Sequence, residues 1–552
     1  MSSPINLNQV AQLARLKHGQ GALDEAIALY GQLVRVAPRN SELLQLMGVA
    51  HLQKGELDQA ANWLRKANKI DPRSPSVLAN LGAVYRRQGF PRKAVQACLA
   101  AAKAAPAMAN AHFNLARAYH DLEEFDSAIA SYECVIALTP NDSDAYLNLG
   151  VALLRTMDRD PPRWRRAMSA FERVLRLQPA SHEAYANIGH LLLMRGWIHA
   201  ALAFYDKGAA ANPSVKRLRY LRSAAHLILG HVGEGWDDYE FRTETDVGPR
   251  IARRPPPPPY WNGEDLSGRR IYVWSEQGLG DQVIYANCVP DLIARAGHVY
   301  IESKPRLTAV FGRSFPAATV LGRKAEDEHV PAPPDADYQV SLGSLGKFFR
   351  RALSDFPRHQ GYLRPDPRKV ERFRQKYSAL ASGRRIVGLS WRSQNALVGH
   401  EKSAEILGWG DVLQVPGVWW VNLQYGDCAA DLAAVKAKLG VDVYQDAEVD
   451  PMGDLDDFFA QVAALDLLVS TSNTAVHVAG SQNVPTWIIL PKVGGTMWYW
   501  FLDRSDSPWY PSVRLFRESG ERPAGTPWWR DVVKRVGADL KNWSAGGELG
   551  HG

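Results

Sequence analysis

The sequence predicts two architectures in succession, an array of paired α-helices over residues 1–245 and then two α/β lobes built on parallel sheets. Small residues and prolines recur at a fixed 34-residue step in the first half. Five consecutive prolines, Pro255–Pro259, indicate a stiff connector. Beyond them, short β-rich runs alternate with stretches of helical spacing, a pattern typical of parallel sheets covered by helices.

The 34-residue period is carried by several classes of position. The proline class is Pro38, Pro72, Pro106 and Pro140, and the alanine class is Ala26, Ala60, Ala94 and Ala128. The small residues allow two helices to approach closely, and each proline ends the second helix. The pattern resembles the tetratricopeptide repeat over residues 7–215, in six units, one of which carries an insertion around 158–163. A seventh, degenerate unit, 216–245, is expected to cap the array.

Asparagine recurs at the sixth position of four successive units, as Asn80, Asn114, Asn148 and Asn187. In the repeat family this position lies on the first helix, which lines the concave, peptide-binding face. An asparagine amide has one acceptor and two donors, so such a ladder could hold an extended peptide by its backbone. The alternative is that asparagine is simply common at this repeat position. O-linked N-acetylglucosamine transferases have a similar ladder in front of their catalytic domain.

Composition excludes several classes of protein. Hydrophobic residues make up 46% of the 552 residues and charged residues 22%, which argues against a disordered or fibrous chain. Neither an apolar run long enough to span a membrane nor a secretory leader is visible. The four cysteines are far apart, so we expect no disulfide framework and no zinc site, and a cytoplasmic location. The net charge of +7 is spread along the chain and mildly favours anionic ligands. A nucleic-acid partner is not expected, because no basic run with interleaved aromatic residues is visible in the sequence.

The second half is expected to contain two lobes with a ligand between them. Its first strand is Arg270–Ser275, followed by the glycine turn Gln277–Asp281, and the second lobe opens with the strand Ile386–Ser390. Ligands of parallel sheets bind at the carboxyl ends of the strands. The expected boundaries are 246–261 for the proline-rich linker, 262–370 for the N-terminal lobe and 371–552 for the C-terminal lobe.

Four motifs occur in a fixed order in these lobes. They are Glu276–Asp281 (EQGLGD), Val387–Trp391 (VGLSW), Ser470–Gly480 (STSNTAVHVAG), and Asp506–Pro511 with Arg514–Phe516. Together they resemble bacterial glycosyltransferases of the lipopolysaccharide heptosyltransferase superfamily, in the branch fused to tetratricopeptide repeats. The resemblance covers residues 262–545. It implies a GT-B fold of two Rossmann-like lobes with the donor in the cleft, and an inverting, metal-independent reaction.

Asp281 is the expected catalytic base. The superfamily has an aspartate at this motif position as general base, and an inverting displacement needs a carboxylate to take the proton of the acceptor hydroxyl. The structural alternative is a cap for the following helix, and both roles are compatible. Glu276 is the reserve candidate.

The donor is expected to bind to the second lobe. Ser472, Asn473 and Thr474 begin a helix whose free backbone N–H groups could hold a nucleotide-sugar phosphate. The superfamily has an Asp-Thr pair where this chain has Ser472-Asn473, which leaves the identity of the donor open. His477 matches a family histidine that faces the phosphate or the leaving group, and a buried structural histidine is the alternative.

Four further residues complete the expected donor site. Lys402 follows a strand as a family lysine does and could neutralise the leaving phosphate, a role for which Arg392 competes. A solvated surface lysine is the alternative. Gln424 and Tyr425 resemble the loop that contacts the nucleotide base, although a plain turn fits them equally well. No metal ligand and no cofactor apart from the nucleotide-sugar substrate is expected. An Asp-x-Asp pair ending at Asp456 is interpreted as the start of a helix.

The leading prediction is therefore a glycosyltransferase that moves a sugar from a nucleotide sugar to a Ser or Thr hydroxyl of a protein held by the repeats. Flagellin is the first candidate acceptor, because repeat-fused bacterial enzymes of this kind include flagellin-modifying transferases. One alternative is a transferase acting on lipid-linked or capsular glycans, with the repeats used for assembly. The other is a non-catalytic repeat scaffold whose transferase lobes have decayed.

Overall fold

The computed structural model describes residues 7–156, 162–245, 254–325, 330–393, 399–453, 455–492, 497–519 and 527–549. The chain forms two compact units, Met1–Leu191 and Leu192–Gly552. Residues 158–161 of the predicted insertion and 246–253 of the predicted linker lie outside the described residues.

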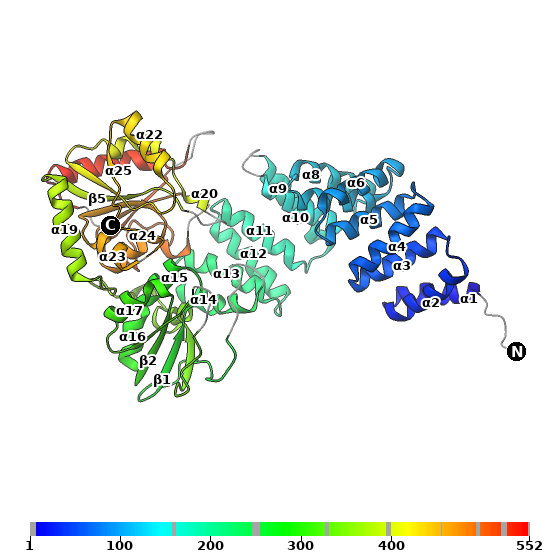
Figure 1. The fold of residues 1–552 in the computed structure, drawn as a ribbon, viewed down its shortest axis with the longest axis horizontal. Coiled ribbons are helices and arrows are strands. Elements are labelled where there is room, and N and C mark those ends of the chain that lie inside the picture. The colour runs from blue at the N-terminus through cyan, green and yellow to red at the C-terminus, as the bar shows by residue number, and fades with distance from the viewer. Residues whose placement is uncertain are drawn as a thin grey trace. The chain divides into compact units, whose positions relative to one another are not determined.

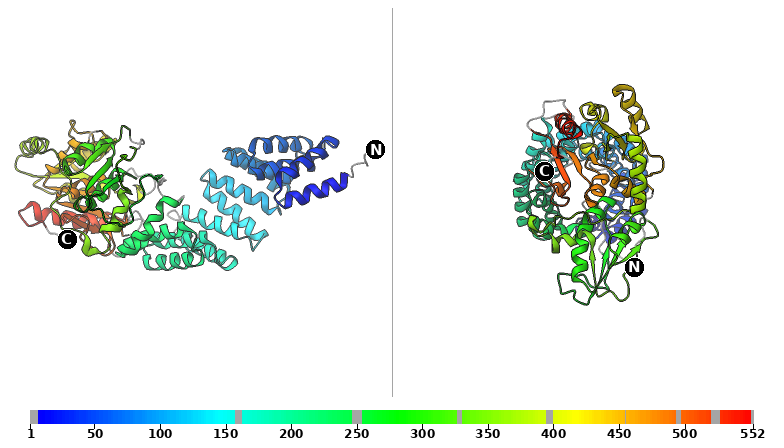
Figure 2. Two further views of the ribbon diagram at one scale, coloured as in Figure 1. Left: turned by 90° about the horizontal axis from the view of Figure 1, so that it is seen from below. Right: turned by 90° about the vertical axis from the view of Figure 1, so that its left-hand side faces the viewer.

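The first unit is a stack of antiparallel helix pairs (Figures 1 and 2). Its helices are α1 (Leu7–Gly19), α2 (Leu23–Val36), α3 (Ser41–Lys54), α4 (Leu57–Ile70), α5 (Pro75–Arg87), α6 (Pro91–Ala104), α7 (Ala109–Asp121), α8 (Phe125–Leu138), α9 (Ser143–Arg155), α10 (Arg163–Leu177) and α11 (His182–Met194), which crosses the boundary between the units. A Cβ atom on Gly82 would lie 2.1 Å from Cys98 Sγ, and one on Gly150 would lie 2.4 Å from Phe171. The small residues of the repeat are thus required by helix packing, which confirms the predicted helical array.

The second unit begins with three more helices, α12 (Ile198–Ala211), α13 (Lys216–Ile228) and α14 (Val232–Tyr239), and the 3₁₀ helix η2 (Glu240–Glu244). Helix α14 packs against the first α/β lobe. The buried Trp236 donates its Nε1–H to the backbone oxygen of Arg350 at 2.9 Å. A Cβ atom on Gly346 would lie 2.3 Å from the Trp236 ring. The degenerate seventh unit is therefore built into the core of the α/β region.

The first sheet has four parallel strands in the order β3-β2-β1-β4. They are β1 (Arg270–Trp274), β2 (His298–Ser303), β3 (Thr319–Gly322) and β4 (Tyr338–Ser341). Helices α15 (Leu279–Tyr285), α16 (Val289–Arg295) and α17 (Thr308–Ser314) lie in the connections, and α18 (Leu345–Phe349) follows β4. The chain adds β2 and β3 on one side of β1 and then returns to add β4 on the other. The strand order therefore reverses between β1 and β4.

The second sheet has six parallel strands in the order β10-β9-β8-β5-β6-β7. The strands are β5 (Arg385–Ser390), β6 (Val418–Asn422), β7 (Val443–Tyr444), β8 (Leu467–Thr471), β9 (Thr486–Leu490) and β10 (Val513–Arg517). The helices are α19 (Pro367–Ala381), α20 (Gly399–Lys402), α21 (Gly410–Leu413), α22 (Ala429–Leu439), α23 (Leu455–Ala463), α24 (Thr474–Ser481) and α25 (Arg530–Ser544). Here the order reverses between β5 and β8. The predicted alternation of strands and helices is confirmed as a parallel α/β region.

Aromatic rings join the helical part of the second unit to both sheets. Trp500 and Trp509 are completely buried, and half-buried Trp498 meets the Trp236 ring edge-on, with centroids 5.3 Å apart. Trp500 and Trp509 are therefore core residues. Among the described helices, none has the length and apolar character needed to cross a bilayer.

Candidate functional site

The sequence-predicted residues of the second half follow strands at the two points where strand order reverses. Glu276 and Asp281 come after β1, Arg392 and Lys402 after β5, and Ser472–Thr474 after β8. In open parallel sheets, the loops at a reversal point diverge and leave room for a ligand at the carboxyl ends of the strands. The fold therefore places these segments where a ligand of either sheet would bind.

Asp281 is half-buried at the third position of α15. Its Oδ2 accepts the backbone N–H of Gly278 at 3.0 Å, so it caps the helix from inside the first turn. Burial raises the pKa of Asp281 to about 6, an effect that Glu276 strengthens and that Gly278, Lys402 and Lys304 oppose. A carboxylate with such a pKa can take up a proton near neutral pH, as a general base must.

Lys402 ends the short helix α20 and is only 5% exposed. Among the described residues, no hydrogen bond or ion pair joins its ammonium group to a partner. Burial lowers its pKa, and the nearby charge of Asp281 acts in the opposite direction. The alternative of a solvated surface lysine is therefore wrong. A buried cation that forms no ion pair with any described residue is suited to an anionic ligand.

His477 lies in α24 among aromatic residues. Its Nδ1 is 2.9 Å from the hydroxyl of Tyr510 and its Nε2 is 3.3 Å from that of Tyr499, while Trp500 stacks on the ring. Burial, reinforced by Lys402, lowers the pKa of His477 to about 3. The imidazole is thus neutral at physiological pH and carries no positive charge, and both of its nitrogens have a tyrosine hydroxyl as partner.

The glycine turn that carries Asp281 touches α24 directly. A Cβ atom on Gly280 would lie 3.2 Å from His477 Cδ2 and 3.8 Å from Thr474 Oγ1. Gly280 has an ordinary negative φ, so the close approach of the turn to α24 is what disfavours a side chain there. The expected base and the expected phosphate-binding helix are therefore neighbours, although about 190 residues separate them in the sequence.

The start of α24 is organised by Asn473. Its Oδ1 accepts the backbone N–H of Ala475 at 3.0 Å, and its Nδ2 donates to Ser390 Oγ at 2.7 Å. Ser472 is buried and accepts a hydrogen bond from Trp500 Nε1 at 2.8 Å. Thr474 is half-buried. Asn473 is thus an N-cap that also ties β8 to β5.

Gln424 and Arg392 make internal contacts at the ends of β6 and β5. The buried Gln424 Oε1 accepts the backbone N–H groups of Trp391 at 3.0 Å and Arg392 at 2.9 Å. The guanidinium of Arg392 donates to Asp431 at 2.8 Å. Tyr425 beside them is half-buried. The Gln424 side chain therefore holds two strand ends together, and its expected contact with a nucleotide base remains a prediction.

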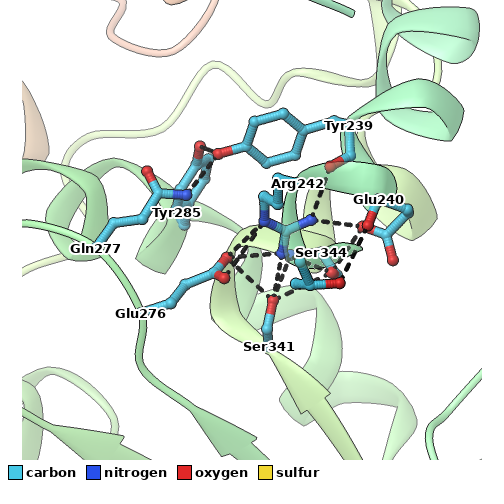
Figure 3. Close-up of polar contacts among 9 residues, drawn as sticks. Tyr239, Glu240, Arg242, Glu276, Gln277, Tyr285, Ser341 and Ser344 are labelled. Atoms are coloured by element: carbon cyan, nitrogen blue, oxygen red, sulfur yellow. Dashed lines mark hydrogen bonds and ion pairs between the residues drawn. The ribbon is translucent and has the colours of Figure 1, made fainter. Parts of the chain in front are cut away.

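Glu276, the reserve base, is held by other groups. Both of its carboxylate oxygens face the guanidinium of Arg242, with Oε1 at 2.7 Å from Nη2, and Ser341 donates to Oε1 at 3.1 Å (Figure 3). Its side chain is 2% exposed. Of the two carboxylates, Asp281 is therefore the one that is free to receive a proton.

The four asparagines of the repeats occupy equivalent places in the first unit. Each is the sixth residue of its helix, in α5, α7, α9 and α11, and each is half-buried. Asn114 Nδ2 donates to Asn110 at 3.2 Å and to the backbone of Ala79 at 3.4 Å, and Asn148 Nδ2 donates to the backbone of Asp144 at 2.7 Å. Their carbonyl oxygens have no partner among the described residues and can accept hydrogen bonds from a ligand.

Sequence reasoning missed the tyrosines around His477 and the role of Arg242. Tyr499 lies between Trp498 and Trp500, Tyr510 follows Trp509, and no spacing distinguishes the two tyrosines from core aromatics. Arg242 lies in the degenerate repeat, 34 positions before Glu276. A buried acid directly after a strand needs a cation or several donors, and this was the available signal.

Comparison with known proteins first defines the class. Models of the tetratricopeptide repeat match residues 17–83 and 116–156, so the chain is a tetratricopeptide-repeat-containing protein. Repeats of this kind generally bind peptides or proteins. A curated relative, Protein FlbA of Caulobacter vibrioides, is 33% identical over 372 residues, which cover 63% of this chain. The chain spans 60% of the length of that relative.

Solved structures resemble parts of the chain at low overall similarity. A MamA protein has 25% identity and a TM-score of 0.27, covering 31% of this chain and 92% of its own. A tetratricopeptide repeat protein from Parabacteroides merdae has 16% identity and a TM-score of 0.36, covering 44% of this chain and 94% of its own. YrrB, described as having an unusual peptide-binding site, has 18% identity and a TM-score of 0.30, covering 34% of this chain and 95% of its own.

Proposed function

We propose that the chain is a glycosyltransferase of the GT-B type, located in the cytoplasm, which moves a sugar from a nucleotide sugar to a Ser or Thr hydroxyl of a protein recruited by the repeats. The observation that carries the proposal is the meeting of Asp281, Lys402 and the start of α24. They provide a proton acceptor, a buried cation and a helix N-terminus at the reversal points of two parallel sheets.

In the proposed reaction, the acceptor oxygen forms a bond to the anomeric carbon of the donor as the bond from that carbon to the phosphate oxygen breaks. Asp281 takes the proton of the acceptor hydroxyl, and the nucleoside diphosphate leaves with the bonding electron pair. The direct displacement inverts the anomeric centre. The pKa of about 6 suits this step, because the carboxylate is ionised at neutral pH yet basic enough to bind a proton.

The developing charge on the leaving phosphate is offset in the proposal by Lys402 and by backbone N–H groups at the start of α24. Neutral His477, whose two nitrogens contact tyrosine hydroxyls, supplies a fixed surface against Gly280. These groups do what a divalent metal does in other transferases, so the reaction is proposed to be metal-independent.

The repeats supply the acceptor in this proposal. Four asparagines at the same helical position offer carbonyl oxygens at repeating intervals. Such a regular set of acceptors suits the repeating N–H groups of an extended peptide backbone better than it suits one particular side chain of the peptide. Flagellin is the first acceptor to test.

The proposal is tested with the full-length protein in two stages. Uridine, guanosine, adenosine and cytidine diphosphates and their sugar conjugates are first screened for an increase in Tm. The stabilising donor is then incubated with purified flagellin, and intact mass is measured. We expect one nucleotide class to stabilise the chain and the mass of flagellin to rise by one or more sugar residues.

Two results would replace the proposal. Transfer to a lipid-linked or capsular glycan but to no protein would favour the glycan transferase. Absence of both nucleotide stabilisation and turnover would favour the non-catalytic scaffold. Lys402→Met is compared with the wild-type protein in the same assays. It should reduce the increase in Tm caused by nucleoside diphosphates and leave the repeats unchanged.

A further inference from the structure

We propose that the last helical unit, α14 with η2, positions the Asp281 turn through Arg242, so that α14 and η2 belong to the catalytic machinery. This inference rests on the proposed glycosyltransferase function. It names Arg242 as a positioning residue, which acts on Asp281 through Glu276 and the turn between them.

Arg242 connects three segments of the second unit from a completely buried position. Its guanidinium donates to Glu276 after β1, to the Ser341 hydroxyl at 2.6 Å at the end of β4, and to Ser344 at 2.9 Å (Figure 3). It also donates to the Glu240 carboxylate at 3.0 Å and to the backbone oxygen of Tyr239 at 3.2 Å within its own element. Every guanidinium nitrogen therefore has an acceptor, and the side chain is fixed.

The space around the Arg242–Glu276 pair is filled by protein atoms. A Cβ atom on Gly343 would lie 2.0 Å from Glu276 Oε1 and 3.3 Å from Arg242 Nη2. The carboxylate therefore has little freedom to adopt another orientation while the guanidinium is present. Without the guanidinium, the Glu276 carboxylate would be left as an uncompensated buried charge beside the turn.

The next residue of the turn is held from the same element. Gln277 has a φ of 61°, in the left-handed region that non-glycine residues rarely adopt. Its Nε2 donates to the hydroxyl of Tyr239 at 2.6 Å, and that hydroxyl is 2.8 Å from the hydroxyl of Tyr285 at the end of α15. One tyrosine of α14 thus contacts the start of the turn and the end of the helix that carries Asp281.

These contacts reach Asp281 in two ways. The backbone of Glu276 and Gln277 leads directly to Gly278, whose N–H is bonded to Asp281. The charge of Glu276 also acts on Asp281 and raises its pKa. The other charged or titratable groups acting on Asp281 come from every neighbouring element and include Lys304, Lys402, Tyr220, Tyr285, Tyr499 and Tyr510, with neutral His477 in contact with the turn.

The central test compares Arg242→Gln with Arg242→Gln/Glu276→Gln in full-length protein. The single variant leaves a buried carboxylate without a cation, so we expect a lower Tm and a lower kcat. We also expect the acid limb of the pH–rate profile to move to higher pH by about one pH unit, because the uncompensated charge raises the pKa of Asp281. The double variant removes the buried charge, so Tm should recover and the limb should return to the wild-type position or below. The kcat should stay about tenfold low, because the turn is still not held.

A matched control and a milder variant keep the test informative. Arg350→Gln removes another buried arginine of the same lobe, which bonds Asn287 and Asp291 and does not touch the turn. It should lower Tm without moving the acid limb. If Arg242→Gln does not fold, Tyr239→Phe removes only the hydroxyl that holds Gln277, and a several-fold fall in kcat at unchanged donor KM is expected.

A second measurement does not depend on enzymatic turnover, so it tests the role of Arg242 separately from the proposed glycosyltransferase function. The pKa of Asp281 is obtained from the difference in the pH dependence of Tm between each protein and its Asp281→Asn counterpart. A raised pKa in the Arg242→Gln background supports the inference even if no transferase activity is found. Two results together would overturn the inference. They are a kcat that decreases only in proportion to Tm in every variant, and an acid limb of Arg242→Gln that lies at or below the wild-type pH.

Discussion

Two carboxylates five positions apart show how a residue's surroundings decide its use. Glu276 is enclosed by Arg242 and Ser341, and both of its oxygens are engaged. Asp281 has one backbone hydrogen bond, a raised pKa and a buried lysine nearby. Only Asp281 combines access with basicity, which makes it the residue on which the proposed chemistry depends.

Replacing Asp281 with asparagine should separate catalysis from folding. Asparagine can still accept the Gly278 N–H but cannot take a proton, so transfer should fall by roughly 10²–10⁴-fold while nucleotide binding is kept. Steady-state transfer and nucleotide-induced changes in Tm measure the two effects. Asp337→Asn, beside the start of β1 at the opposite end of the sheet, is the matched control. Near-normal turnover of Asp281→Asn would remove this residue from the mechanism.

Activity should decline as pH falls through about 6. The base must be ionised, and the pKa of Asp281 is raised to about 6, so kcat/KM should lose about tenfold per unit below that value. To test this, kcat/KM is measured at about eight pH values between pH 4.5 and 8, a range over which Asp281 passes from mostly protonated to ionised. A flat profile across this range would exclude Asp281 as the base.

The same pKa shift has a consequence for stability with a defined sign. The folded-state pKa lies above the ordinary value of 3.8, so ionised Asp281 destabilises the fold. The penalty is absent below about pH 4, grows as pH rises toward 6 and is complete above it. Asp281→Asn should therefore raise Tm more at pH 8 than at pH 4. An equal change at both values would show that the pKa is not raised.

At the scale of elements, the first helices of the repeats present equivalent polar atoms. The donors of Asn114 and Asn148 are used within the array, while their carbonyl oxygens are available. This refines the predicted ladder. The carbonyl oxygens of Asn114 and Asn148 can accept from a bound backbone, whereas the amide nitrogen of each already donates a hydrogen bond within the array. One hydrogen bond per repeat is therefore the contribution to expect.

Replacing Asn114 and Asn148 together with alanine should raise the acceptor KM. Each lost hydrogen bond contributes about 0.5–1.5 kcal/mol net, so the pair should weaken acceptor binding by roughly 5- to 100-fold. Hydrolysis of the donor in water should not change. Asn68→Ala, on the second helix of its unit, is the control. An unchanged acceptor KM in the double variant would mean that the ladder does not bind the acceptor.

At the scale of the whole molecule, the chain divides within the helical region and not at the proline run. Helices α12–α14 belong to the same compact unit as the two sheets. Trp236 of α14 is in the core of the first lobe, and Arg242 of η2 is the counterion of Glu276. Truncations should therefore be made before α12.

Two truncations should behave differently. Removing residues 1–195 keeps α12–α14, so donor hydrolysis should persist while modification of the acceptor protein falls sharply. Removing residues 1–245 leaves Glu276 without Arg242 and leaves a cavity where the Trp236 side chain was packed. This protein should therefore show no donor hydrolysis and a lower Tm. Hydrolysis rates and Tm of both proteins check this. Full protein modification by the shorter deletion would make the repeats assembly modules.

Activity should persist in excess chelator. Asp456 of the Asp-x-Asp pair is 2.9 Å from Lys369 and is also bonded to Arg313, so its carboxylate is engaged by protein cations. The first aspartate of the pair lies outside the described residues. Transfer is measured with and without the chelator, and loss of activity that Mg²⁺ or Mn²⁺ restores would contradict the metal-independent mechanism.

The sequence by itself determined the repeats, the parallel α/β region and the segments that carry the candidate site. Periodic small residues such as Gly82, strand-forming runs and glycine turns are local signals, and each specifies structure within a few tens of residues. Asparagine at the sixth position of a unit is confirmed as the sixth residue of a helix for the same reason.

Only the tertiary structure decided the electrostatic state of these residues. The raised pKa of Asp281, the neutrality of His477 and the buried position of Lys402 all result from atoms that distant segments bring together. The partner of Glu276 comes from a helix that the sequence assigns to the repeats. Burial and charge pairing depend on which surfaces meet, and no spacing in a single sequence contains that information.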